Sequence, residues 1–455
     1  KYQTPKELIS LKERIVNLES KIYKKQNSRK EGYIDPHTKK FVVASINTLY
    51  NLVYTHDDEK VRKATFEGTE KLALDCIEDY VKLVGKRNEY ARALGFEDFY
   101  AYKSERDEGL TKEEIFGLFK EIYEKTKYKF DYVRKLEKSQ PRLRKPWNFG
   151  HMMSSEFTKE EDPYLQFKDA LMRWGRSFTA LGIDYKKGEL QFDLLDRKGK
   201  SSNGFCHWPK LVGYKQGKRT PGSSSLTCNV VVGKIGEGSV GMSTLFHEGG
   251  HAAHLLSSTQ TQVCFNHEYP PASTAWCETQ SMFLQGIFES SEWRFRYAQN
   301  TDGKTYPFEL YQREVKKLQP LPPGSIMSIM LMSEFEKKVY ECKTLTSAKV
   351  KQFAKQMSKK YSNYSTPSLW VLNAVHIYCW DSACSYHAYG LAHLAVEQWG
   401  AYLRKKHGYI VDNPKIGKEI TKAWQLGSSK TFKESVKFIT GEDLSAESYT
   451  KRISK

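Results

Sequence analysis

The chain is organised around the stretch TLFHEGGHAAH, which occupies residues 244–254 and contains the pattern His-Glu-x-x-His. Residues four apart lie on one face of an α-helix, so His247 and His251 can direct their imidazole nitrogens at one metal ion. Zinc suits this pair of ligands, and Glu248 is placed to take a proton from a zinc-activated water that attacks a carbonyl. The stretch therefore predicts a helix that carries a catalytic metal site.

A catalytic zinc site needs a third protein ligand and keeps its fourth position open. Glu278 is the leading candidate, because it lies in residues 275–288, a run with the apolar density of a buried helix. An unpaired carboxylate in such a helix is costly, and a metal ion would be its partner. Glu268 and His267, in the polar connection before this run, are alternative ligands. We expect one zinc ion per chain, held by the two histidines of the pattern and Glu278.

The composition indicates a large folded protein. Of its 455 residues, 39% are hydrophobic and 13% aromatic, which excludes a disordered chain. No run of about 18 apolar residues occurs, so no membrane partner is expected. Eight cysteines are scattered without a Cys-x-x-Cys pair, which favours a reducing compartment and a cytoplasmic location.

The net charge of +18 raises nucleic acid as a possible partner. However, the densest basic stretches, residues 134–145 and 215–219, lack the interleaved aromatic residues of a base-stacking surface. Elsewhere the basic residues alternate with acidic ones, as on solvated helix faces. We therefore expect no specific nucleic-acid partner.

Hydrophobic periodicity divides the chain into regions. Residues 6–140 show the spacing of three and four that predicts helices, so residues 1–150 are interpreted as an N-terminal helical lobe and 151–455 as a catalytic region. Within the latter we predict a small sheet at about 189–236, the metal helices at about 240–290 and further helices to residue 455. The strand-like runs of the sheet are 191–196, 204–208 and 226–232. A free strand edge there could hold an extended peptide.

A second chemical cluster follows far downstream, in residues 375–390. Its tyrosine hydroxyls and histidines are groups able to stabilise the oxyanion formed when water adds to an amide. The candidates are His376, Tyr386 and Tyr389, with His387 as a rival. A well-packed aromatic helix without a catalytic role is the alternative interpretation.

The sequence resembles peptidase family M3, which includes thimet oligopeptidase, the bacterial dipeptidyl carboxypeptidases and the oligopeptidase F group. The resemblance rests on residues 245–254 and on Glu278 in the setting of residues 278–283. It is supported by similarity in four further stretches, namely residues 192–194, 228–229, 57–66 and 87–95.

This resemblance implies a mainly α fold, a two-lobed helical ellipsoid with a deep substrate channel and a small β-sheet next to the zinc helix. It implies a zinc-dependent peptidase acting on short unfolded peptides, with Glu248 as general base. Tyr386, Tyr389 and His376 match the family's residues that stabilise the tetrahedral intermediate. The state of assembly is expected to be a monomer or a dimer.

Two other classes of protein are compatible with parts of the sequence. A catalytically degenerate peptide-binding or scaffold protein would have the same fold without turnover, and a basic nucleic-acid-binding protein would use the positive charge. The intact His-Glu-x-x-His pattern favours the enzyme. Endopeptidase, dipeptidyl carboxypeptidase and carboxypeptidase action all fit the motifs equally well.

Overall fold

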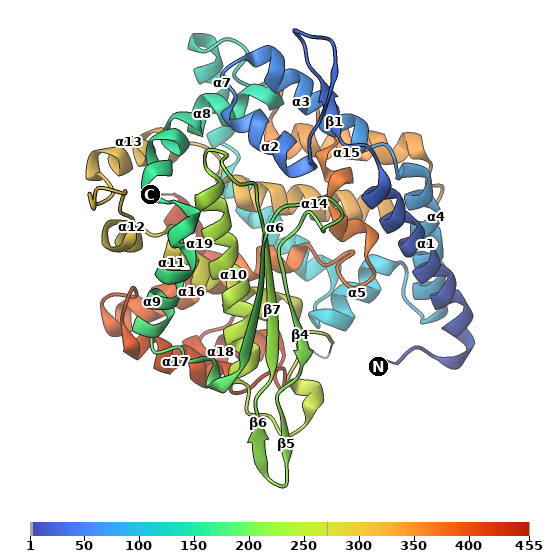
Figure 1. Cartoon of the computed structure of the whole chain (residues 1–455). Coiled ribbons are helices and arrows are strands. Elements are labelled where there is room, and N and C mark those ends of the chain that lie inside the picture. Colours follow the sequence, from blue (N-terminus) through green and yellow to red (C-terminus); the bar gives the residue numbers. More distant parts are fainter. Residues whose placement is uncertain (1–2, 271, 455) are drawn as a thin grey trace.

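The architecture is mainly α-helical, as predicted (Figure 1). The computed structural model describes residues 3–270 and 272–454. The helices of the N-terminal third are α1 (Ile9–Ser28), α2 (Ile46–Thr55), α3 (Glu59–Leu72), α4 (Ile77–Ala93), α5 (Phe99–Asp107), α6 (Lys112–Thr126) and α7 (Lys129–Ser139). Helix α6 begins with a capping box, in which the Thr111 side chain and the Glu114 side chain each accept a hydrogen bond from the other residue's backbone N–H.

The remaining helices follow a short irregular stretch. Those of the middle third are α8 (Pro146–Glu161), α9 (Ala170–Ala180), α10 (Glu237–Ser257), α11 (Thr274–Glu289), α12 (Ser291–Tyr297) and α13 (Phe308–Leu318). Those of the final third are α14 (Gly324–Glu341), α15 (Ser347–Ser362), α16 (His387–His407), α17 (Pro414–Trp424), α18 (Phe432–Thr440) and α19 (Glu447–Ile453). Helices α10 and α11 are the two that were predicted to carry the metal ligands.

A three-stranded sheet lies beside α10, and its strands are the three predicted runs. Strand β7 (Ser223–Val230) is central, with β3 (Glu189–Leu195) parallel on one side and β4 (Phe205–Lys210) antiparallel on the other. Leu226 on β7 is opposite both Phe192 and Cys206, which fixes the register. Strand β4 is therefore an edge strand of this sheet.

Two β-hairpins were not anticipated. Strands β1 (Gly32–Ile34) and β2 (Phe41–Val43) interrupt the region expected to be helical throughout. The turn between them is stabilised by Asp35, whose carboxylate accepts hydrogen bonds from the backbone of His37 and Thr38, at 2.8 Å each. Strands β5 (Gly213–Lys215) and β6 (Lys218–Thr220) form a second hairpin that projects from the lower end of the sheet (Figure 1).

Buried apolar side chains form two large cores. The first joins α1, α4, α5 and α6 to α14, α15 and the first half of α16. The second joins the sheet to α9, α10, α12, α17 and the second half of α16. Helix α11 contributes to both, through Trp276 and Phe283 respectively. The N-terminal helices thus share a core with helices from the final third. The division of the chain at residue 150 into a helical lobe and a catalytic region stays a prediction.

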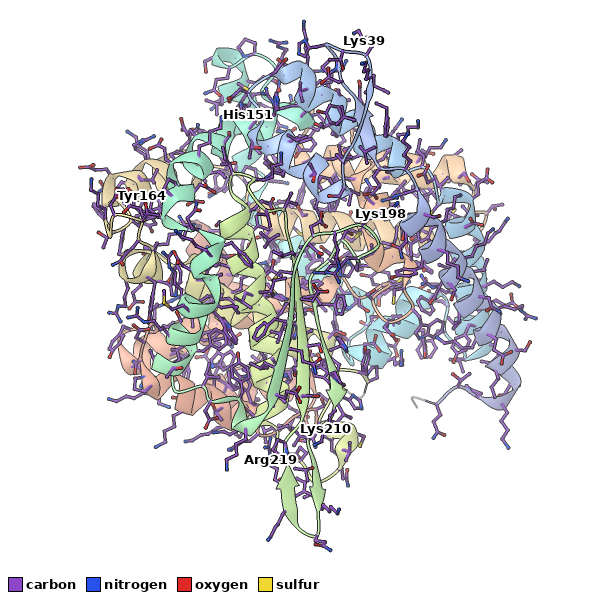
Figure 2. The ribbon with its side chains drawn as sticks, viewed as in Figure 1. Lys39, His151, Tyr164, Lys198, Lys210 and Arg219 are labelled. Carbon is purple, nitrogen blue, oxygen red and sulfur yellow. The ribbon has the colours of Figure 1, made fainter. Side chains whose placement is uncertain are left out.

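Basic side chains are distributed over several elements. Figure 2 shows Lys39 in the β1–β2 turn, Lys198 between β3 and β4, and Lys210 at the end of β4, at well-separated places on the molecule. No helix in the described part of the chain combines the length and apolar character that crossing a bilayer requires.

Candidate active site

The two glycines of the central stretch allow close packing around α10. A Cβ atom on Gly250 would lie 2.7 Å from Ser281 Cα and 3.0 Å from the carbonyl oxygen of Gln280, both on α11. A Cβ atom on Gly249 would lie 2.5 Å from the indole nitrogen of Trp174 on α9. The glycines lower helix propensity by about 1 kcal/mol each, and this cost is offset by the packing that they permit.

Three candidate ligands converge between α10 and α11. Glu278 Oε2 lies 3.2 Å from His247 Nε2 and 3.5 Å from His251 Nε2. One donor atom from each residue lies within 4.8 Å of the other two. Ser281 Oγ donates a hydrogen bond of 3.1 Å to the same Glu278 oxygen and helps to orient it. Two nitrogens and one carboxylate oxygen are a donor set that suits a divalent metal ion such as zinc.

The outer nitrogens of both histidines, the Nδ1 atoms that point away from Glu278, face polar side chains. His247 Nδ1 is hydrogen-bonded to Gln285 Oε1 at 2.9 Å, and His251 Nδ1 lies 2.8 Å from Glu268 Oε2. A proton on each Nδ1 leaves both Nε2 lone pairs directed at the carboxylate of Glu278. This arrangement fits a metal ion bound by the two Nε2 atoms.

The structure separates Glu278 from the alternative ligands. Glu268 lies behind the histidines, where its second oxygen is hydrogen-bonded to His254 Nδ1 at 2.9 Å. His267 Nδ1 accepts a hydrogen bond of 3.2 Å from the backbone N–H of Tyr269, within its own loop. Of these three candidates for the third ligand, only Glu278 faces the Nε2 atoms of both His247 and His251.

Glu248 follows the candidate ligand His247 in the chain and lines the same large cavity as His247, His251 and Glu278. Its side chain is buried, with 6% of the residue exposed. Burial raises the pKa of this carboxyl group above its usual range, partly offset by the neighbouring histidines. A raised pKa brings a carboxylate nearer to the value that suits a proton acceptor at neutral pH.

The downstream cluster reaches the site from another direction. His376 lies in a 3-10 helix, with its ring 5.2 Å from that of Tyr386 and 6.2 Å from that of Tyr389. Burial and interaction with Glu278 raise the pKa of Tyr389, and burial raises that of Tyr386 to about 12. Burial also lowers the pKa of His376, which favours a neutral imidazole. The two tyrosines therefore keep their hydroxyl protons near neutral pH.

The rival candidate His387 has a different environment. It is buried, with 1% exposed, and its Nδ1 is hydrogen-bonded to the Tyr100 hydroxyl at 2.9 Å. The cavity is lined by His376 and Tyr389, but by neither Tyr386 nor His387. The imidazole of His387 thus helps to fix the start of α16 on α5.

The backbone that carries the cluster is held by side chains far away in the sequence. Arg87 on α4 donates to the carbonyl of residue 377, and Lys103 on α5 to that of residue 381, at 2.8 and 2.9 Å. Glu336 on α14 accepts from the backbone N–H of Cys384 at 2.9 Å. No local pattern marks these residues, and only their burial as charged groups could have drawn attention to them.

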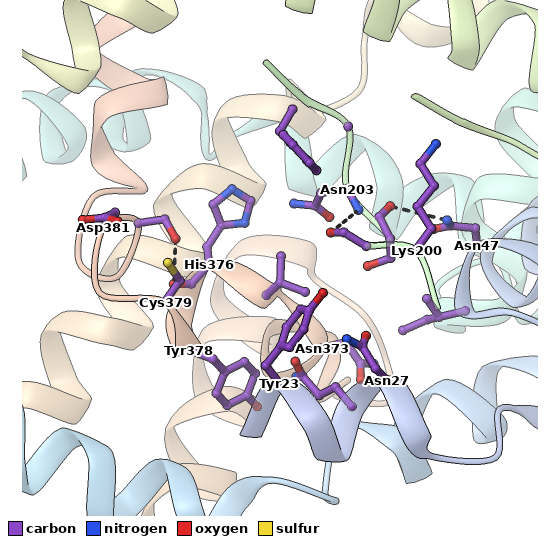
Figure 3. A pocket seen from close by; sticks show the side chains of 18 of the residues that line it. Tyr23, Asn27, Asn47, Lys200, Asn203, Asn373, His376, Tyr378, Cys379 and Asp381 are labelled. Atoms are coloured by element: carbon purple, nitrogen blue, oxygen red, sulfur yellow. Dashed lines mark hydrogen bonds between the residues drawn. The ribbon is translucent and has the colours of Figure 1, made fainter. Parts of the chain in front are cut away.

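The three candidate metal ligands line a cavity of about 1400 Å³. Its polar end, shown in Figure 3, is lined by α1, α2, the β3–β4 loop and residues 373–382. There the Asn47 amide donates to Asp196 Oδ1 at 3.3 Å and to the carbonyl of Ser202 at 3.4 Å, which links α2 to the loop. Pockets that bind drug-sized ligands measure about 300–1,000 Å³, so this cavity has room for a longer chain such as a peptide.

A helical pair that presents two histidines and a glutamate to a large cavity is typical of metal-dependent peptidases. The sequence model of peptidase family M3 matches residues 184–455, and the chain belongs to this family. It is accordingly a metallopeptidase by family. A comparison with curated protein sequences found no match.

Solved structures with a similar fold cover nearly the whole chain. One is described as PZ peptidase A with inhibitor 2, at 18% identity and a TM-score of 0.69, covering 99% of this chain and 76% of that one. A putative oligoendopeptidase F has 18% identity, a TM-score of 0.67 and coverage of 99% and 75%. A putative oligoendopeptidase F from Bacillus anthracis str. Ames has 17% identity, a TM-score of 0.64 and coverage of 99% and 74%. The similarity confirms the predicted mainly α-helical fold over nearly the whole chain.

Proposed function

We propose that the chain is a zinc-dependent peptidase that hydrolyses peptide bonds in short unfolded peptides. One zinc ion would be held by His247, His251 and Glu278. When bound, it would polarise the scissile carbonyl and lower the pKa of a water molecule. The observation that carries the proposal is the approach of Glu278 Oε2 to both Nε2 atoms, at 3.2 and 3.5 Å.

The side chains around this position have complementary roles. Glu248 accepts the proton of the attacking water and later donates it to the leaving amine. Tyr389, together with Tyr386 or His376, donates a hydrogen bond to the oxyanion of the tetrahedral intermediate. Edge strand β4, which lines the cavity through Phe205, Cys206 and Trp208, offers backbone groups to an extended peptide.

The role of Glu248 is tested by the Glu248→Gln variant and a fluorogenic quenched peptide. Removal of the proton acceptor should lower kcat by about 10²–10⁴-fold while the chain still binds zinc. Glu237→Gln, a change to the other glutamate of α10, is the matched control and should keep full activity. Unchanged turnover by Glu248→Gln would contradict the mechanism. Peptide binding without cleavage by the unmodified chain would instead indicate a peptide-binding protein of the same fold.

A further inference from the structure

A second group of potential metal ligands lies directly behind the first. It consists of His254, Glu268 and Cys277, which offer one donor atom each within 4.8 Å of one another. His254 is on the same face of α10 as His251, and Cys277 precedes Glu278 on α11. Nitrogen, carboxylate oxygen and sulfur are all accepted by zinc and by other thiophilic divalent cations.

Two members of this group already share a hydrogen bond. His254 is fully buried, and its Nδ1 is already hydrogen-bonded to Glu268 Oε1 at 2.9 Å. Its Nε2 is also buried and has no hydrogen-bond partner among the described residues. Since Nε2 lies on the other side of the imidazole from Glu268, Nδ1 is the donor that faces this group. A cation between Nδ1 and Glu268 would replace the proton that they share, and the imidazole would carry its own proton on Nε2, where no hydrogen bond is lost.

A route to the group also exists, because Glu268 and Cys277 both line the large cavity. Zinc–nitrogen and zinc–sulfur bonds of about 2.0–2.3 Å place the donors of a tetrahedral site about 3.5 Å apart. The group would therefore need side-chain movements of about 1 Å to close around an ion. Side-chain rotation on two packed helices can supply such movements.

We propose that His254, Glu268 and Cys277 form a second site for a thiophilic divalent cation, zinc or cadmium, and that this ion is inhibitory. Cys277 would bind as the thiolate and release its proton to solvent. Glu268 couples the two sites, because its other oxygen lies 2.8 Å from His251 Nδ1. An ion that draws this carboxylate away leaves His251 less well oriented for catalysis.

The test is a cadmium titration of the zinc-loaded chain. The exposed thiols of Cys264 and Cys379 are first replaced by serine, so that they do not bind the probe. Cadmium binding is followed by the ultraviolet absorption of the cadmium–thiolate bond and by mass spectrometry, which also reports whether zinc is retained. One cadmium ion should bind beside one zinc ion, and peptidase activity should fall about 10–100-fold as it does so.

Three variants decide the assignment. Cys277→Ser and His254→Gln should both abolish the cadmium signal, whereas Cys206→Ser, which removes another thiol of the cavity wall, should not. A signal that is absent from the starting protein, or that persists in Cys277→Ser, would overturn the proposal. Thermal melting establishes that each variant is folded, and His254→Gln remains decisive if Cys277→Ser does not fold.

Only the inhibitory effect depends on the proposed function, because cadmium binding is measured without substrate. Binding without any peptidase activity in the starting protein would refute the proposed function alone. Binding that leaves an active enzyme fully active would refute the inhibition. Activity without a second bound ion would refute the second site alone.

Discussion

Helices α10 and α11 and the segment of residues 375–389 face the same cavity, but they are fixed in different ways. The histidines of α10 share a face because they are four residues apart, and Gly250 lets α11 approach closely. The downstream segment has only a short 3-10 helix before α16 begins, and its backbone is held by side chains from α4, α5 and α14. The position of a side chain that is set by helical periodicity can be predicted from the nearby sequence. The position of one that is set by long-range contacts cannot be predicted in this way.

The sharpest test of the helical pair compares Glu278 on α11 with Glu268, which lies in the connection between α10 and α11. Glu278→Ala should remove a ligand, so that zinc is lost and activity falls to background. Glu268→Gln should weaken zinc binding by only about 10–100-fold, because it changes a contact to a ligand and not the ligand itself. Zinc affinity is measured by competition with a chelator. The opposite ranking would assign the third ligand to Glu268.

The downstream segment is tested through a hydroxyl group. Tyr389→Phe should lower kcat by about 10²–10³-fold, the usual effect of removing one donor to an oxyanion, with zinc content unchanged. Tyr378→Phe is the matched control, because Tyr378 also lines the cavity but donates its hydroxyl proton to the carbonyl of Leu372 at 2.6 Å. Equal kinetics for the two variants would remove Tyr389 from the mechanism.

The contact between α14 and the segment of residues 375–389 should make the free energy of unfolding depend on pH. Burial raises the pKa of Glu336 from 4.5 to about 7, so the folded chain holds this proton more tightly than the unfolded chain. The resulting stabilisation is complete below pH 4.5 and is lost as the pH rises to about 7. Glu336→Gln should therefore gain stability relative to the unmodified chain by about 1.4 kcal/mol per pH unit across this window.

Denaturant unfolding at a series of pH values measures the difference in the free energy of unfolding between Glu336→Gln and the unmodified chain. Glu161 provides a comparison from the second core, because burial raises the pKa of its carboxyl group to about 7 as well. Glu161→Gln should show the same window although its side chain does not touch the downstream segment. A gap between Glu336→Gln and the unmodified chain that is constant with pH would show that Glu336 is ionised in the folded state.

The smallest expected effects concern the glycines of the two helices. Gly250→Ala places a methyl group against the backbone of α11 and should destabilise the fold by about 1–3 kcal/mol. Gly286→Ala on α11 adds the same group where no atom lies within 4 Å, so it should stabilise by up to about 1 kcal/mol. Urea unfolding of both variants separates packing from helix propensity. Stabilisation by both substitutions would contradict the close packing of α10 on α11.

Sequence patterns predicted much of the fold, and their failures have physical causes. The three runs of the sheet and the two metal helices were predicted because alternation and a period of three to four residues are local properties. The β1–β2 hairpin was missed because its strands have only three residues each, and its turn depends on side-chain contacts of Asp35. The roles of Arg87, Lys103 and Glu336 were missed because their partners are backbone groups nearly fifty or more residues away.

The sequence by itself determined the pair of histidines, the glutamate between them and the family resemblance. Helical geometry places those side chains on one face whatever the rest of the chain does. Only the tertiary structure decided that Glu278 faces the inner nitrogens while Glu268 lies behind them, and that Tyr389 but not His387 lines the cavity. The physical reason is that these positions depend on how separate elements pack, and packing is set by contacts between residues far apart in the chain.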